Sequence, residues 1–183
     1  MKKYLQYFLI GIIISCSNQL SQEERLIKDN IGKKVNLEMF EDKLVFHKDT
    51  MIHFNELLNK YDFISLVYLQ DGCSPCFPKI VDWHINLDSI GYQSKHTVLF
   101  IIEGSVYSNY EKIIQNVLEV DDIEFNLFMT IDRGFNFLKG NSDIPFVIIA
   151  SSVLVNKKRE IVMIGNPFSS NEMKGLFKRI RNL

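Results

Sequence analysis

The chain of 183 residues is 46% hydrophobic and 23% charged, close to an average soluble globular protein, and its length suits a single domain. These values exclude a disordered chain, a collagen-like repeat and a protein with several membrane spans. The 21 basic and 22 acidic residues give a formal net charge of −1, so we expect no nucleic-acid partner. Three cysteines, an odd number, are too few for a miniprotein held together by disulfides.

Residues 1–15 have the pattern of an export signal. Lys2 and Lys3 form a short positive segment, and the run 5–14 is apolar apart from Gln6. That run is too short to cross a hydrocarbon core, which takes about 20 helical residues. Its length does suit the apolar part of a signal peptide. A buried N-terminal helix or strand is the alternative interpretation.

The end of this segment, Ile13-Ile14-Ser15-Cys16, resembles a bacterial lipobox. The resemblance implies cleavage before Cys16 and attachment of lipid to this residue, so that a lipid membrane is a partner. The protein would then be exported and anchored to a bacterial membrane, facing the periplasm or the cell exterior. A plain signal peptide that leaves Cys16 free is the competing interpretation.

Residues 16–32 are polar and predict a flexible tether, and residues 33–183 predict one folded domain. Alternating apolar and polar residues predict two short strands, 35–40 and 43–47, as an N-terminal β-hairpin. Apolar residues at helical spacing then predict a helix over 51–61.

Strands and helices alternate through the rest of the chain. We expect strands over 63–70, 96–102, 124–131 and 146–150, a hairpin over 151–168 that turns near Asn156, and helices within 71–90, 109–120 and 171–183. Ser170 or Asn171 would cap the last helix. The pattern predicts an α/β fold, with a mixed central sheet, helices on both faces and the N-terminal β-hairpin as an extension.

The sequence Cys73-Ser74-Pro75-Cys76 follows a predicted buried strand and opens a predicted helix. In a βαβ pattern, this placement is typical of thioredoxin-like redox sites. Unpaired backbone N–H groups and the helix dipole stabilise a thiolate at a helix N-terminus. We therefore predict Cys73 as the exposed nucleophile and Cys76 as the more buried thiol that resolves a mixed disulfide. Gly72, Ser74 and Pro75 would complete the active-site loop.

Over 33–183 the chain resembles the thioredoxin-like domain of the membrane-tethered TlpA/ResA-like thiol–disulfide oxidoreductases of bacteria. Besides the C-x-x-C and the order of elements, segment 131–138 resembles the aspartate–glycine stretch that leads to the family's cis-proline. The resemblance implies that Pro145 is that cis-proline, beside Cys73. It also implies that Ile144 offers its backbone N–H and C=O to an extended substrate peptide.

Two positions depart from the family pattern. Gly72 stands where many relatives have tryptophan, and Val67 stands where thioredoxins bury an acidic residue that moves protons. We expect proton transfer to use water, Asp71 or a carboxylate such as Glu103 instead. The single tryptophan, Trp83, is predicted to be helix core.

The leading hypothesis is an exported, tethered thiol–disulfide oxidoreductase without a cofactor. Its partners would be exported cysteine-containing proteins and a membrane or periplasmic redox partner. We predict no metal site, because the four histidines are scattered and no second C-x-x-C exists. The alternatives are a non-catalytic binding lipoprotein with the same fold and a metallochaperone that binds Cu(I) through Cys73 and Cys76.

Overall fold

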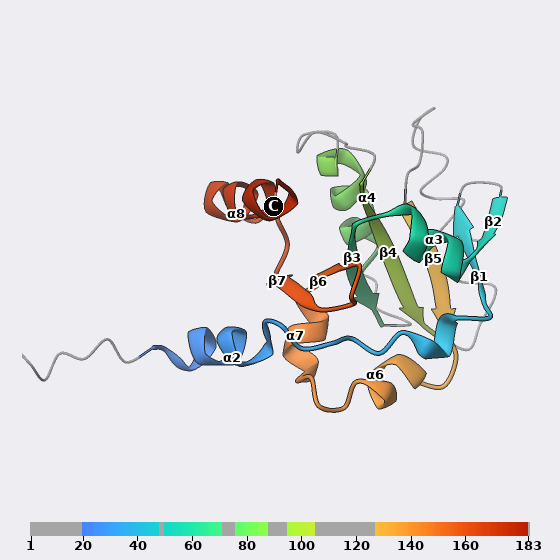
Figure 1. Cartoon of the computed structure of the whole chain (residues 1–183), viewed down its shortest axis with the longest axis horizontal. Coiled ribbons are helices and arrows are strands. Elements are labelled where there is room, and N and C mark those ends of the chain that lie inside the picture. The colour runs from blue at the N-terminus through green and yellow to red at the C-terminus, as the bar shows by residue number, and fades with distance from the viewer. Residues whose placement is uncertain (1–19, 48–49, 71–75, 88–94, 105–126, 183) are drawn as a thin grey trace, which may run out of the picture.

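The computed structural model describes residues 20–47, 50–70, 76–87, 95–104 and 127–182. In this part of the chain, seven strands form one mixed sheet in the order β2-β1-β5-β4-β3-β6-β7 (Figure 1). Its centre consists of three parallel strands, β3 (Phe63–Leu69), β4 (His96–Glu103) and β5 (Leu127–Asp132). Their nearly continuous apolar sequences are buried on both faces, as expected for parallel strands. The three strands confirm the sequence prediction.

Antiparallel strands flank this centre on both sides. β1 (Leu44–His47) and β2 (Thr50–His53) form a hairpin beside β5, and β6 (Val153–Asn156) and β7 (Ile161–Ile164) form one beside β3. The C-terminal hairpin is where the sequence predicts it. The N-terminal hairpin lies further along the chain than predicted.

The shift of the N-terminal hairpin has a physical reason. The expected strand 35–40 instead ends in the short 3₁₀ helix η1 (Glu38–Phe40), and β2 takes up the start of the expected helix 51–61. Val35, Leu37 and Phe40 are all buried. The alternating apolar residues of this segment are buried against the core, although the segment does not form a regular strand.

Helices cover both faces of the sheet. On one face, α4 (Cys76–Leu87) and α8 (Asn171–Arg181) bury Ile80, Trp83 and Phe177 in a shared apolar cluster. On the other face lie α3 (Phe54–Lys60), α6 (Asn136–Gly140) and α7 (Phe146–Ala150). The predicted helices at α4 and α8 are confirmed, as is the core position of Trp83. Ser170 caps α8 by accepting from the N–H of Met173 at 3.2 Å. The helix predicted over 109–120 lies outside the described residues.

The predicted strand 146–150 is wrong, because these residues form α7. Pro145 lies at the N-cap of this helix, and its carbonyl accepts from the N–H groups of Ile148 and Ile149 at 2.9 and 3.4 Å. A short run of five apolar residues does not distinguish a buried helix from a strand by periodicity.

The segment expected to be a flexible tether contains the helix α2 (Gln22–Asn30). Ser21 and Glu24 form a reciprocal capping box at its start, and its residues Leu26 and Ile27 pack against the core cluster. Figure 1 shows α2 in blue, reaching away from the sheet. Among the described helices, none is both long and apolar enough to cross a membrane.

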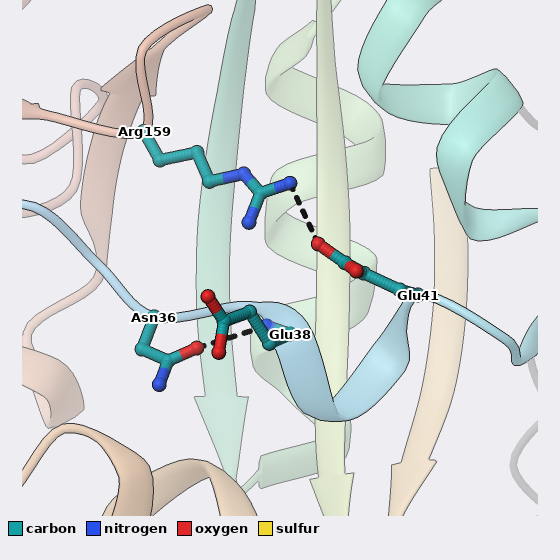
Figure 2. Close-up of polar contacts among 4 residues, drawn as sticks. All are labelled: Asn36, Glu38, Glu41 and Arg159. Atoms are coloured by element: carbon teal, nitrogen blue, oxygen red, sulfur yellow. Dashed lines mark hydrogen bonds and ion pairs between the residues drawn. The ribbon is translucent and has the colours of Figure 1, made fainter.

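The chain after α2 is fastened to the C-terminal hairpin. The N–H of Gly32 donates to the carbonyl of Ile161 at 2.8 Å, and the N–H of Val35 donates to that of Arg159 at 2.8 Å. The side chain of Arg159 also donates to Glu41 at 3.0 Å (Figure 2). Beside this ion pair, the Asn36 side chain accepts from the backbone N–H of Glu38 at 2.9 Å (Figure 2). These contacts cover part of the outer edge of β7.

Candidate functional site

The carboxyl edge of the sheet is defined here by the ends of β3, β4 and β5, at Leu69, Glu103 and Asp132. β3 ends at Leu69 and α4 begins at Cys76, so the C-x-x-C joins this edge to a helix N-terminus. The sequence analysis predicts that placement. Five predicted site residues lie outside the described part of the chain: Cys16, Gly72, Cys73, Ser74 and Pro75.

Tyr68 and Glu103 form a hydrogen-bonded pair at the carboxyl edge. The Tyr68 hydroxyl donates to Glu103 Oε2 at 2.8 Å. Burial is the main cause that raises the pKa of Tyr68, and the hydrogen bond and charge of Glu103 raise it further, followed by the charge of Asp132. Tyr68 therefore remains a hydrogen-bond donor to Glu103 at ordinary pH. Glu103 itself is partly exposed, so water reaches this carboxylate.

Asp132 is a fully buried carboxylate beside this pair. It stands opposite Glu103 in the register of β4 and β5. Its two oxygens accept from the backbone N–H groups of Asn136 at 3.0 Å and Phe137 at 2.9 Å. Asp132 therefore satisfies N–H groups at the start of α6, which explains in structural terms the aspartate–glycine stretch seen in the sequence.

Val67 is buried beneath α4, in the apolar cluster that contains Ile80 and Trp83. No acidic residue occurs in β3. The expectation that water, Asp71 or a carboxylate such as Glu103 takes over proton transfer stays a prediction, and Asp71 lies outside the described residues. Among the described residues, Glu103 is a partly exposed carboxylate at the carboxyl edge, which is what a proton acceptor in this place needs.

The expectation that Pro145 is cis is wrong, because every peptide bond of the described residues is trans. Ile144 is buried, and its N–H donates to the carbonyl of Asn141 at 3.0 Å. This N–H is therefore occupied within the turn that precedes α7. Contact of Ile144 and Pro145 with substrate stays a prediction, but pairing of a peptide with the Ile144 N–H does not fit this geometry.

Sequence reasoning missed Ser152, which lies directly before β6. β6 is antiparallel to β3, and its first residue, Val153, pairs with Leu66 near the carboxyl end of β3. Ser152, which precedes Val153, therefore lies on the side of the carboxyl edge. The φ angle of Ser152 is 70°, a left-handed conformation that is uncommon outside glycine. Its side chain is 5% exposed, and its hydroxyl has no hydrogen-bond partner among the described residues. No sequence pattern marks such a residue.

Two exposed apolar side chains lie on α7, near the same edge. Phe146 is 48% and Val147 is 54% exposed. The ring of Phe146 contacts that of Tyr68 edge-on, with centroids 6.4 Å apart. Tyr68 is the penultimate residue of β3, so the ring of Phe146 lies near the carboxyl end of this strand.

The described residues include no group of three or more histidine, cysteine, aspartate or glutamate side chains able to hold a metal ion. His96 is a buried core residue, with Nε2 at 3.0 Å from the Ser65 hydroxyl. This is the environment expected for a histidine with a structural role.

No family model matches the sequence, and no curated protein matches it. Solved structures do match the fold. The thioredoxin domain of a thiol-disulfide oxidoreductase from Bacteroides vulgatus has a TM-score of 0.52 and 12% identity, covering 82% of this chain and 96% of that one. A candidate protein disulfide isomerase from Bacteroides thetaiotaomicron has a TM-score of 0.51 and 15% identity, covering 83% and 88%.

A yeast mitochondrial 1-Cys peroxiredoxin has a TM-score of 0.55 and 14% identity, covering 83% of this chain and 74% of that one. At these identities the likeness concerns the fold. The strand order, the position of α4 after the central strand and these similarities agree. The chain therefore has a thioredoxin-like fold, as its C-x-x-C and the order of its elements predict.

Proposed function

We propose that this protein is a thiol–disulfide oxidoreductase whose reactive groups are Cys73 and Cys76. The observation that carries the proposal is the place of the C-x-x-C, between the end of β3 and the start of α4, in a thioredoxin-like fold. A thiolate at a helix N-terminus is stabilised by unpaired N–H groups and by the helix dipole. α4 has 12 residues, so it supplies both.

The reaction is a two-step exchange. The Cys73 thiolate attacks one sulfur of a substrate disulfide, forms a mixed disulfide and releases the other substrate sulfur as a thiolate. The Cys76 thiolate then attacks Cys73, which forms the Cys73–Cys76 disulfide and releases the second substrate thiolate. Two electrons pass from the protein to its substrate, and the substrate thiolates take up protons. The same steps in reverse oxidise a substrate dithiol.

Deprotonation of a thiol requires a proton acceptor at the carboxyl edge. Glu103 is partly exposed there and accepts a hydrogen bond from Tyr68. Tyr68 packs in the cluster on the face opposite α4, so the proton that Cys76 loses would reach this carboxylate through water. We assign Glu103 this role, which thioredoxins give to an acidic residue at the position of Val67.

We propose exported polypeptides with cysteines as substrates. The exposed Phe146 and Val147 on α7 offer an apolar surface that suits an unfolded segment better than a small thiol. Lipid on Cys16 would hold the protein at a bacterial membrane, facing the periplasm or the cell exterior. Continued turnover as a reductase needs a dithiol donor, which we place in a membrane or periplasmic redox partner.

A second candidate function is that of a non-catalytic binding lipoprotein with this fold. The observation that favours it is Val67, since an apolar residue occupies the position of the usual buried acid. In that case the Cys73–Cys76 pair would be a permanent disulfide or an unused dithiol.

The decisive measurement is the reduction potential of the cysteine pair in the full chain, purified in detergent. The protein is equilibrated in a series of dithiol redox buffers, and its free thiols are then labelled with a reagent whose added mass is measured. A two-electron transition near about −270 mV supports a reductase, and one near about −120 mV supports an oxidant. A pair that resists reduction below about −300 mV is structural and supports the binding protein.

Matched variants complete this test. Cys73→Ser should abolish both the transition and the reduction of insulin disulfides. Cys16→Ser should leave both intact, because Cys16 is assigned to the lipid anchor, but should release the protein from membranes. If insulin reduction persists in Cys73→Ser, the assignment of Cys73 as the nucleophile is wrong.

A further inference from the structure

Positive charge is concentrated on the C-terminal helix α8. This helix contains one acidic residue, Glu172, and four basic residues, Lys174, Lys178, Arg179 and Arg181. α8 therefore carries a formal charge of +3, four positive groups against one negative group, whereas the whole chain carries −1. The residues outside α8 thus carry −4 in total. Such a separation of charge favours contact between this helix and an anionic partner.

The basic residues of α8 lie on the polar side of an amphipathic helix. Phe177 is fully buried in the apolar cluster that α8 shares with α4. Lys174, Lys178 and Arg181 follow one another at intervals of four and three residues, so they share one side of α8. The guanidinium of Arg181 lies 5.2 Å from the ring centroid of Phe177, and Lys178 and Arg179 are exposed. One side of α8 therefore packs on the protein, and its basic side faces outward.

These basic groups are available to a partner. No ion pair between described residues involves Lys174, Lys178 or Arg179. The helix dipole favours basic residues in the last turn, where Lys178, Arg179 and Arg181 lie. The dipole does not account for Lys174, which lies one turn earlier and extends the same basic side.

α8 lies at the same end of the molecule as the start of the described chain. Figure 1 shows α8, in red, and α2, in blue, both extending from the sheet at one end of the long axis. Leu20 is the first described residue and comes four residues after Cys16. Four residues of fully extended chain span at most about 14 Å. A lipid on Cys16 would therefore keep this end of the molecule close to the membrane surface.

We propose that α8 binds the anionic headgroups of a phospholipid membrane, an inference that rests on the proposed lipid anchor for the nearness of that membrane. Lysine and arginine side chains bind phosphate oxygens through charge-assisted hydrogen bonds. Four basic residues alone give weak and reversible binding, so the lipid on Cys16 retains the protein. The contact of α8 then orients the domain on the membrane surface.

The test measures the binding of the full-length Cys16→Ser protein to vesicles by sedimentation. The vesicles contain phosphatidylcholine alone, or equal parts of phosphatidylcholine and the anionic phosphatidylglycerol. At physiological ionic strength the Debye length is about 8 Å, so charges close to the surface dominate the binding. Each of these charges strengthens binding about fivefold, so Lys178→Gln together with Arg179→Gln should weaken binding to the anionic vesicles about 30-fold. Binding to phosphatidylcholine alone should not change.

Two further variants are the controls. Lys60→Gln together with Lys139→Gln removes the same charge from exposed positions on α3 and α6, on the other face of the sheet, and should bind as the background does. Lys178→Arg together with Arg179→Lys keeps both charges on α8 and should keep the binding. If circular dichroism shows that the glutamine variant of α8 is unfolded, added salt replaces it, because salt should release the background protein from the anionic vesicles.

The outcomes separate this proposal from the lipid anchor. Equal binding of the background and the α8 glutamine variant to anionic vesicles would overturn it, whereas a loss confined to that variant supports it. Displacement from the vesicles by double-stranded DNA of equal total charge would make α8 a general polyanion site and overturn the membrane assignment. The anchor is tested separately by the release of Cys16→Ser protein from cell membranes, and the vesicle result stands whether or not Cys16 carries lipid.

Discussion

Two buried serines lie near opposite ends of the central strand. Ser65, near the start of β3, is 2% exposed and its hydroxyl lies 3.0 Å from His96 Nε2. Ser152, beside the other end of β3, is similarly buried but has no partner in the described structure. The buried hydroxyl at the amino edge of the sheet, where β3 and β4 begin at Phe63 and His96, is thus paired within the fold. At the carboxyl edge, the buried hydroxyl of Ser152 has no hydrogen-bond partner among the described residues.

This difference separates a buried hydroxyl that the fold itself satisfies from one that has no partner among the described residues. A buried hydroxyl with a partner stabilises the fold, whereas one without a partner costs stability unless a reacting group completes it. The carboxyl edge also carries the partly exposed Glu103 and the apolar side chains of α7. The amino edge carries His96 against Phe177 of α8, with ring centroids 4.9 Å apart. We expect changes at the amino edge to alter stability and changes at the carboxyl edge to alter reactivity.

The largest expected effect is the pH dependence of stability that His96 produces. Burial, followed by the charge of Arg181, lowers the pKa of His96 from 6.5 to about 3. Between these values the unfolded chain binds a proton that the folded chain does not. The folded protein is therefore most stable above the pKa that His96 has in the unfolded chain, and it loses stability as the pH falls below that value. At about pH 5 the loss is about 2 kcal/mol relative to pH 8.

Urea unfolding of the full chain at the two pH values measures this loss. His96→Gln should remove most of the pH dependence, because glutamine does not titrate. His53→Gln is the control, since His53 is exposed at the end of β2 and its loss should leave the dependence unchanged. The same pH dependence in His96→Gln would show that the amino edge is not the cause.

The next effect compares the two serines directly. Ser65→Ala leaves a buried ring nitrogen of His96 without its partner, which should cost about 1.5 kcal/mol of stability. Ser152→Ala removes a hydroxyl that has no such partner, so its cost should be below about 0.5 kcal/mol. The urea midpoints of the two variants at pH 8 measure the difference. Equal midpoints would contradict the expectation that the Ser65 hydroxyl stabilises the fold more than the Ser152 hydroxyl does.

Much of the fold follows from the sequence, because its long elements have strong patterns. The apolar runs of β3 and β4 and the helical spacing in α4 and α8 are long enough to determine their structure. In the sequence the C-x-x-C spans the link between β3 and the first residue of α4, and its role as the reactive site stays a prediction. One missed element was readable, because Ser21 and Glu24 have the spacing of the capping box that starts α2.

The rest could not be derived from local pattern. Residues 146–150 are apolar and include β-branched side chains, so propensity favours a strand, yet packing on β3 makes them the helix α7. The left-handed Ser152 makes a local hydrogen bond to Ile149 and a second one to Gly165, which only the pairing of β6 with β7 brings beside it. Tyr68 and Glu103 are 35 residues apart and meet through the register of parallel strands.

At the carboxyl edge, Glu103→Gln should slow the exchange reaction about fivefold without lowering stability, because it removes a proton acceptor. The pH profile of insulin reduction should change in this variant. Tyr68→Phe tests the same pair from the donor side, since it removes the hydrogen bond at 2.8 Å but keeps the ring. An unchanged profile in Glu103→Gln would assign proton transfer to water or to Asp71.

The smallest expected effect is that of Phe146→Ala on the choice of substrate. Phe146 is half exposed on α7, and its ring contacts Tyr68 next to the end of β3. A polypeptide that reaches Cys73 can bury this ring, but a small aromatic disulfide cannot cover it. Partial burial of one phenylalanine is worth well under its full transfer energy, so kcat/KM for insulin should fall about threefold.

The same variant should reduce a small aromatic disulfide at the rate of the wild type. Ile85→Ala is the matched control, because Ile85 is also a large exposed apolar residue, at 61%, but lies near the end of α4 that is remote from Cys76. A fall for both substrates would mean that Phe146 supports the site through Tyr68 and does not bind the polypeptide. A fall confined to insulin would make α7 part of the substrate surface, and the open carboxyl edge would then include both a reactive part and a binding part.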